Sequence, residues 1–187
     1  MDLLEKSSNT INVFSHRDLW KNNLMFKFDE VDGKIDYSSP KHCILLDYQI
    51  ARYLPLTVDV LMAIVINTRK THRQQNLEDY LTFYYERLGY ELKEEGIEVS
   101  RKITFEEFKI SCVEFMVLPL TINAVILTLT LMPSEYVKEL NLNSDNFYKI
   151  CNVFRDDVVM DLIERDDDYK ECLLEAIEEL IEYIYGK

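Results

Sequence analysis

The sequence predicts an α+β fold that is mainly helical, with a few short strands confined to its first third. Two observations carry this prediction. Between Asn12 and Leu46 the apolar runs are short and separated by turn residues, whereas after Asp47 apolar residues recur at the spacing of amphipathic helices. The chain has 187 residues, of which 48% are hydrophobic and 29% charged, a balance typical of a globular protein with one sizeable core.

Short strands are expected on both sides of a polar loop near the N-terminus. The run "INVFS" predicts a strand that enters the loop, and "NLMFKFD" alternates Leu24, Phe26 and Phe28 on one face. The run "EVDGK" supplies a turn at Gly33, and "HCILLD" predicts a wholly apolar strand that ends at Asp47.

The next segment predicts helices. Leu56 to Asn67 is apolar, and Thr57 is a candidate for its N-cap. The polar stretch "NTRKTHRQQN", which ends at Asn76, is expected to be a solvated loop, with Asn76 as the cap of the following helix.

Three later helices have recognisable starts. Thr104 and Glu107 form a capping box, a second helix begins at a Ser144 cap, and the acidic run 166–168 suits the positive end of the last helix. No internal repeat or Pro/Gly/Ser-rich linker divides the chain. We therefore expect a single domain over residues 1–187, with the loop and strands in 1–55 and a helical subdomain in 56–187.

The apolar segment Val113–Met132 is about as long as a membrane span. It contains Glu114, Asn123 and a central Pro119, and no basic residues flank it to define an orientation. A buried helix pair broken at Pro119 is the preferred interpretation, and a transmembrane helix is the alternative.

The net charge of −13 disfavours binding to nucleic acid and to anionic membranes. The N-terminus lacks the basic and apolar runs of a secretory signal, so we expect a cytoplasmic protein. The cysteines are far apart, without a CxxC pair, which favours buried thiols over a zinc site or a disulfide framework. They are Cys43, Cys112, Cys151 and Cys172.

The stretch "SHRDLWKNN" carries the clearest sign of chemistry. His16-Arg17-Asp18, followed after four residues by Asn23, has the HRDxxxxN spacing of a kinase catalytic loop. Phosphoryl transfer needs a carboxylate that takes the proton of the acceptor hydroxyl and divalent cations that neutralise the transferring group. Asp18 is the candidate carboxylate and Asn23 a candidate metal ligand. In the alternative interpretation, Asp18 caps a turn and His16 is a hydrogen-bonded core histidine.

A second metal ligand is expected from a neighbouring strand. Asp47 ends an apolar strand, where ligand-binding residues often lie, and it begins the triplet Asp47-Tyr48-Gln49 in place of the DFG of protein kinases. His42 and His72 have no partner at metal-ligand spacing and are expected to be structural.

The runs "HRDLWKNNLMFKFD" and "LLDYQIARYLPLTVDVL" resemble the ecdysteroid kinase-like family, an offshoot of the choline kinase and aminoglycoside phosphotransferase group. Members of that family typically carry an HGDLWxNN-type loop, a DFQ-type motif with a nearby arginine, and an aspartate that opens an apolar helix. This sequence matches the pattern with Trp20, the Asn22–Asn23 pair, Gln49, Arg52 and Asp59.

The resemblance implies a protein kinase-like C-terminal lobe that uses ATP and Mg²⁺ to phosphorylate a small-molecule alcohol, with a steroid among the acceptors. It makes Asp18 the catalytic base, Asn23 and Asp47 the magnesium ligands, and His16 and Asp59 supports of the loop. Arg17, Trp20, Gln49 and Arg52 would lie near the substrate or the loop. Arg17 departs from the family pattern because it replaces the usual glycine.

Kinases cover the nucleotide with a preceding lobe that holds a glycine-rich turn and a lysine. Only 15 residues precede His16, and none of the four glycines is spaced to cradle a phosphate. We therefore expect the sequence to represent a C-terminal lobe with weak or no activity in isolation. A catalytically silent module that binds a ligand or a protein is the second hypothesis, and the oligomeric state stays open.

Overall fold

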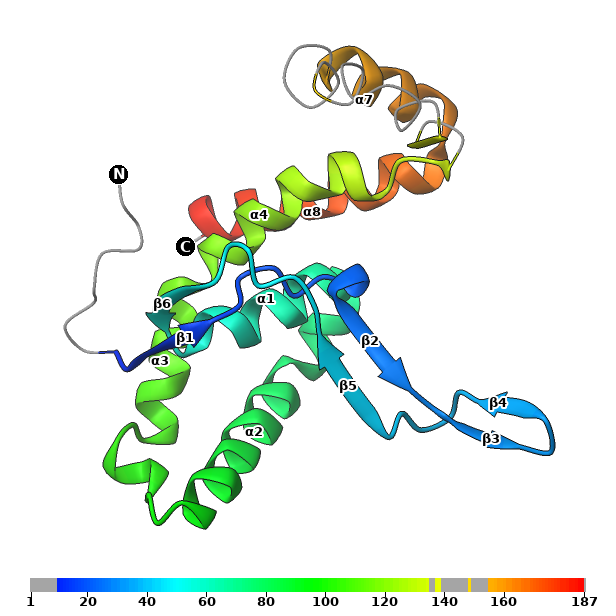
Figure 1. The fold of residues 1–187 in the computed structure, drawn as a ribbon. Coiled ribbons are helices and arrows are strands. Elements are labelled where there is room, and N and C mark those ends of the chain that lie inside the picture. Colours follow the sequence, from blue (N-terminus) through cyan, green and yellow to red (C-terminus); the bar gives the residue numbers. More distant parts are fainter. Residues whose placement is uncertain (1–9, 135–136, 139–147, 149–154, 187) are drawn as a thin grey trace. The chain divides into compact units, whose positions relative to one another are not determined.

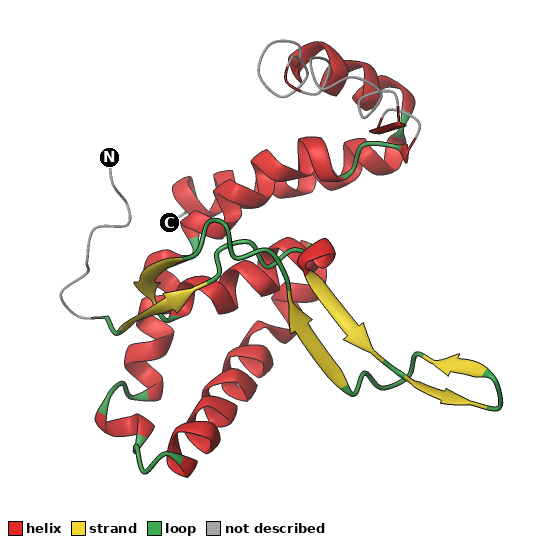
Figure 2. Ribbon diagram, viewed as in Figure 1, coloured by secondary structure: helices red, strands yellow, loops and turns green. Residues whose placement is uncertain are grey.

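The computed structural model describes residues 10–134, 137–138, 148 and 155–186. Short antiparallel strands occupy the first third of this described chain, and helices make up most of the rest (Figure 1, Figure 2). The mainly helical α+β fold class is therefore confirmed. The helix start predicted at Ser144 and the thiol of Cys151 lie outside the described residues.

Contacts divide the chain into two compact units, Met1–Pro119 and Leu120–Lys187. Unit 1 contains the described strands and the helices α1, α2 and α3, and unit 2 contains most of α4 together with α7 and α8. Each unit is described by itself below. The single domain expected over residues 1–187 stays a prediction.

Unit 1 begins with three two-stranded antiparallel sheets. The pair formed by β3 (Asp29–Val31) and β4 (Lys34–Asp36) is a hairpin closed by Asp32 and Gly33, whose φ angles are 52° and 75°. Two central residues with positive φ are what a tight hairpin turn needs to match the twist of its strands, so the turn predicted at Gly33 is confirmed. The pairs are β1 (Asn12–Ser15) with β6 (Arg52–Pro55), β2 (Leu24–Lys27) with β5 (His42–Leu45), and β3 (Asp29–Val31) with β4 (Lys34–Asp36).

The β2–β5 pair leads into the β3–β4 hairpin (Figure 1) and is largely exposed to solvent. All four residues of β5 are exposed, including the apolar Ile44 and Leu45. Cys43 lies in this strand, so the expectation of a buried thiol is wrong at that position. An apolar run was sufficient to predict a strand, but not to predict what packs against it.

Helix α1 (Thr57–Asn67) is the core helix of unit 1, with seven of its eleven residues buried. Both α2 (Lys70–Glu94) and α3 (Phe105–Phe115) contact it. The predicted cap at Thr57 is wrong, because the N-cap position is Leu56 and the Thr57 hydroxyl lies 3.0 Å from the Ser111 hydroxyl of α3.

Helix α2 begins earlier than predicted. Asn76 lies inside it, and the stretch expected to be a solvated loop is helical from Lys70 onward. Arg73 is only 4% exposed, and its Nη1 donates to the carbonyls of Val65, at 3.0 Å, and of Thr68. These carbonyls lie at the C-terminal end of α1, where helical acceptors lack partners and a positive charge is favoured. Arg73 therefore anchors the start of α2 to the end of α1.

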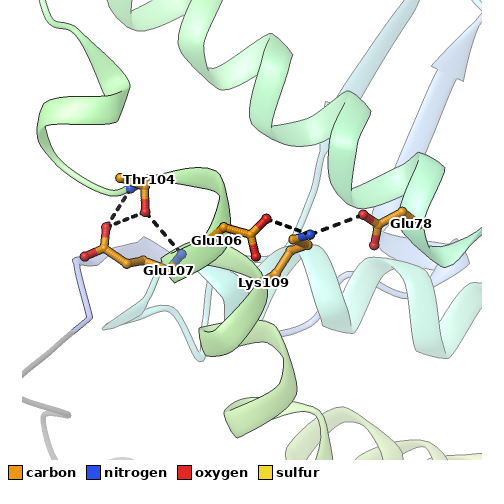
Figure 3. Close-up of polar contacts among 5 residues, drawn as sticks. All are labelled: Glu78, Thr104, Glu106, Glu107 and Lys109. Carbon is orange, nitrogen blue, oxygen red and sulfur yellow. Dashed lines mark hydrogen bonds and ion pairs between the residues drawn. The ribbon is translucent and has the colours of Figure 1, made fainter.

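The capping box before α3 is confirmed (Figure 3). The Thr104 hydroxyl accepts from the Glu107 backbone at 3.2 Å, and the Glu107 carboxylate accepts from the Thr104 backbone at 2.8 Å. The hydrogen bonds from the Thr104 backbone and side chain lower the pKa of Glu107. One turn further, Lys109 lies 3.0 Å from Glu106 and 3.5 Å from Glu78 of α2, so it bridges two helices. A short 3-10 turn, η2 (Val99–Arg101), precedes the box.

The break in the apolar segment falls at Met116, between α3 and α4 (Val117–Thr130), and not at Pro119 as predicted. Pro119 lies in the first turn of α4, where its missing N–H costs no helical hydrogen bond. Among the described residues, no single helix is long and apolar enough to cross a membrane, although α3 and α4 together, as a bent pair, satisfy that test of length and composition.

Unit 2 has its own apolar core. The Tyr169 hydroxyl donates to the Thr128 carbonyl at 3.0 Å, which ties α8 (Asp167–Tyr185) to α4. Asp166 accepts from the Tyr169 backbone at 2.9 Å, so the acidic start predicted for the last helix is confirmed. Helix α7 (Arg155–Arg165) contacts α8. The buried residues of this core are Met132, Leu162, Tyr169 and Leu173.

Candidate functional site

The loop after β1 is fixed to the first turn of α1 by Asp59. Its Oδ2 accepts from the His16 backbone at 2.6 Å, and its Oδ1 accepts from the Arg17 backbone at 2.9 Å. One carboxylate thus satisfies two consecutive backbone donors, and its charge strengthens both bonds. Burial is the main cause that raises the pKa of Tyr84 on α2 to about 12, and the negative charge of Asp59 adds to this effect.

His16 joins the loop to the segment that leads into Asp47. The ring is 2% exposed; its Nδ1 accepts from the Asp18 backbone at 3.2 Å, and its Nε2 lies 2.8 Å from the Leu46 carbonyl. A neutral ring with its proton on Nε2 satisfies both contacts at once. The ring also lies 4.4 Å from that of Tyr48. His16 therefore sets the position of Asp18 relative to the strand end.

Asn23 turns its amide nitrogen toward Asp18. The Nδ2 atom donates to the Asp18 carbonyl at 2.9 Å and to Asp18 Oδ2 at 2.8 Å. Both partners are oxygens, so the opposite orientation of the amide would set oxygen against oxygen. Asn23 Oδ1 is consequently the amide atom that faces away from these two contacts. Asn23 ends the short 3-10 helix η1 (Lys21–Asn23) and is buried.

Asp47 lies at the same end of the β2–β5 pair as Asn23. Leu24 pairs with Leu45, and one step further the Leu46 backbone donates to the Asn23 carbonyl at 2.9 Å. Asp47 follows directly, with a positive φ of 63°, and its Oδ1 accepts from the Gln49 backbone at 3.4 Å. The structure thus brings the strand end that carries Asp47 beside the loop that carries Asn23.

Asp18, Asn23 and Asp47 supply two carboxylates and one amide. Such oxygen donors suit Mg²⁺, which usually completes its shell with water and phosphate oxygens. Within the part of the chain that the structure describes, no three His, Cys, Asp or Glu side chains gather as a metal cluster. The predicted set contains only two residues of those types, and its donor chemistry fits a magnesium ion shared with a phosphate ligand. The metal roles of Asn23 and Asp47 stay predictions.

Arg17 adopts the backbone conformation that favours glycine. Its φ of 71° lies in the left-handed region, where a Cβ atom is strained and glycine is not. This accounts for the glycine at that position in the family pattern. The Arg17 side chain extends toward the turn after Asp47, where its Nη1 lies 3.5 Å from the Ile50 carbonyl.

Of the other residues predicted near the loop, Trp20 lies within it, and Gln49 and Arg52 lie on the segment after Asp47. Trp20 is half-buried, and its carbonyl accepts from the Asn23 backbone at 2.9 Å. Gln49 is exposed in the turn after Asp47. Arg52 is exposed at the start of β6, where it pairs with Ser15, the residue before His16. Their contact with a substrate stays a prediction.

Asn67 also holds the loop, which the sequence did not predict. Its Nδ2 donates to the Leu19 carbonyl of the loop at 2.6 Å and to the Ala63 carbonyl of its own helix at 2.8 Å. Helix α1 therefore holds the loop from both ends, through Asp59 in its first turn and Asn67 in its last. The sequence shows Asn67 only as one of three polar residues, with Thr57 and Asp59, in an otherwise apolar helix, and this does not indicate its partner.

The two histidines expected to be structural lie apart from this loop. His42 is exposed in β5, opposite Lys27. His72 lies on α2, and its ring contacts the hydroxyl of Tyr80.

Residues 1–96, slightly more than half of the chain, match the ecdysteroid kinase-like family. No curated protein and no solved structure shows a significant match to the chain. The matched residues include the loop held by Asp59, the strand end at Asp47 and the whole of α1. The chain belongs to the ecdysteroid kinase-like family.

Proposed function

We propose that the chain is the kinase-like C-terminal lobe of a phosphotransferase that transfers phosphate from ATP to the hydroxyl of a small molecule. The observation that carries this proposal is the Asp18–Asn23 pair, because the loop that presents it is held at His16 and Arg17 by Asp59. A carboxylate whose supporting backbone is already fixed can orient an acceptor without further ordering.

Asp18 orients the acceptor hydroxyl and takes its proton. Its Oδ2 accepts from Asn23, which leaves Oδ1 as the oxygen for the hydroxyl. Asn23 Oδ1 and the carboxylate of Asp47 hold magnesium, which when bound neutralises negative charge on the phosphoryl group. The His16 ring contacts both the Asp18 backbone and the Leu46 carbonyl, and it thereby holds Asp18, the proton acceptor, close to the strand end that carries Asp47.

The acceptor is a small apolar alcohol, with a steroid as the first compound to test, given the membership of the chain in the ecdysteroid kinase-like family. We assign four residues to the substrate side: Arg17 and Trp20 within the loop, and Gln49 and Arg52 on the segment that follows Asp47. The proposed location is the cytoplasm, and recovery in the membrane pellet after carbonate washing would contradict it.

The test of the base is Asp18→Asn, which keeps an oxygen for the Asn23 amide but cannot take a proton. In the full-length enzyme that contains this lobe, assayed with radiolabelled ATP, Mg²⁺ and a panel of steroid alcohols, we expect turnover to fall by about 10²-fold or more. Asp79→Asn, at an exposed position on α2, is the matched control and should keep the parental rate. Equal rates for Asp18→Asn and the parent would remove Asp18 from the chemistry.

The metal site has a test that does not depend on turnover. Mn²⁺ can replace Mg²⁺ as a paramagnetic probe, and its binding is measured by electron paramagnetic resonance in the presence of ATP. We expect Asp47→Asn and Asn23→Ala to weaken Mn²⁺ binding, whereas Asp79→Asn leaves it unchanged. Equal Mn²⁺ affinity in all four proteins would refute the assignment.

The second candidate function is a catalytically silent module that binds a ligand or a protein. Arg17 favours it, because this bulky residue stands in a backbone conformation suited to glycine within the loop itself. The two candidates differ in one measurement on the full-length protein that contains this lobe. A steroid that binds in calorimetry but accepts no label from ATP, with Arg17→Gly as inactive as the parent, would support the silent module.

A further inference from the structure

Helix α8 carries two apolar stripes, and only one of them packs inside unit 2. Tyr169, Leu173 and Ala176 are buried in unit 2. The second stripe, Leu174, Ile177, Ile181 and Ile184, repeats at intervals of three, four and three residues, and its members are between 36% and 51% exposed. We refer to these four residues as the α8 stripe.

The spacing of the α8 stripe is that of the seam between two packed helices. Alternating steps of three and four residues keep apolar side chains on one line along a helix, and a second helix covers such a line with its own side chains. Adjacent to the stripe lies the buried face of α8, which fixes this helix within unit 2. A partner would therefore meet a helix that is already packed on its other face.

Charge restricts the partner. Helix α8 contains seven acidic residues and one basic residue between Asp167 and Tyr185. Glu178 lies one helical turn from both Leu174 and Ile181, at the edge of the stripe. A second copy of α8 would bring two such acidic helices together, and an anionic membrane would be repelled. A basic helix instead gains both apolar burial and opposite charge.

We propose that the α8 stripe is a docking surface for a basic amphipathic helix of another protein. The partner places apolar side chains at the same three-and-four spacing on the stripe and directs Lys or Arg toward Glu178 and the neighbouring acidic residues. This interaction surface does not depend on the proposed transfer of phosphate.

The test uses the full chain and a fluorescent 21-residue peptide with Leu at the seam positions and Lys at the flanking ones. We expect it to bind with one-to-one stoichiometry in fluorescence anisotropy and to weaken as salt is added, because the charges are exposed. Ile181→Asp should weaken binding at least tenfold, and Glu178→Lys should weaken it mainly at low salt. Ile35→Asp is the matched control, because Ile35 is 54% exposed in the β3–β4 hairpin whereas Ile181 is 51% exposed.

Four outcomes would overturn the proposal. The first is an absence of binding, and the second is equal binding of a peptide with the same composition in shuffled order. The third is full affinity in Ile181→Asp when circular dichroism shows the parental helix content. The fourth is a different occupant: a dimer that Ile181→Asp dissolves in sedimentation velocity, or phosphatidylserine vesicles that bind the chain through the stripe.

Discussion

The contact of Asp59 with the loop can be tested by removing its carboxylate with Asp59→Ala. Two backbone donors, on His16 and Arg17, then lose acceptors that lie at 2.6 and 2.9 Å. A hydrogen bond to a charged group contributes about 1.5–3 kcal/mol, and the half-buried position of Asp59 favours the lower end of that range. Adding about 0.5 kcal/mol for the lost charge at the helix N-terminus, we expect a decrease of about 3–4 kcal/mol in the free energy of unfolding.

Urea denaturation of the parent, Asp59→Ala and Asp59→Asn measures this change. The asparagine variant keeps one acceptor oxygen, so its loss should be about half that of the alanine variant. Asp79→Ala, at an exposed position on α2, is the control and should stay within about 0.5 kcal/mol of the parent. An unfolding free energy of Asp59→Ala equal to that of the control would show that the carboxylate does not hold the loop.

Arg17→Gly removes a Cβ atom from a left-handed backbone, so we expect a gain of about 1 kcal/mol in unfolding free energy, and a loss in urea denaturation would contradict the strained conformation. Thr104→Ala should cost about 1 kcal/mol, because the capping box before α3 is lost. The pKa of Glu107 is lowered in the folded protein. The ionised Glu107 carboxylate therefore stabilises the fold above its unfolded pKa, and this stabilisation is lost as the pH falls through its folded pKa. The difference in unfolding free energy between the parent and Thr104→Ala should consequently shrink as the pH is lowered. Burial raises the pKa of Cys112 to about 12, so a maleimide at pH 8 should label the exposed Cys43 and leave Cys112 unmodified until urea is added. Mass spectrometry of the labelled peptides distinguishes the two thiols.

The features that the sequence predicted correctly are those set by neighbouring residues. The Thr104–Glu107 box, the acidic start of the last helix at 166–168 and the turn at Gly33 each need only residues within four positions of one another. Their side-chain chemistry determines the local backbone wherever the segment lies in the fold.

The features that the sequence did not predict depend on distant partners. Thr57 is a good cap by residue type, but its hydroxyl contacts Ser111, 54 residues away. The stretch after Asn67 is polar, yet Arg73 is buried because it reaches the carbonyls of the preceding helix. Neither contact has a periodic signature in the sequence.

In the candidate site, too, the sequence indicated the contact between nearby residues but not the contact between distant ones. The HRDxxxxN motif brings Asp18 and Asn23 into contact, because only four residues separate them in one tight loop. The role of Asn67 in holding Leu19 was not visible, because a single polar residue at a helix end has many local explanations. The left-handed conformation of Arg17 could be anticipated only from the glycine of the family pattern.

Helix α1 is hydrogen-bonded to the loop at two points, through Asp59 and through Asn67, so local opening of the loop requires a large free energy. A segment held at one end only can fray, whereas one attached to a buried helix at Asp59 and at Asn67 must release both hydrogen-bonding groups together. The amides of His16 and Arg17 should consequently exchange with deuterium only when the core of unit 1 unfolds. A ligand would then meet the loop already in its final geometry, and any slow conformational step during binding would have to arise elsewhere in the chain.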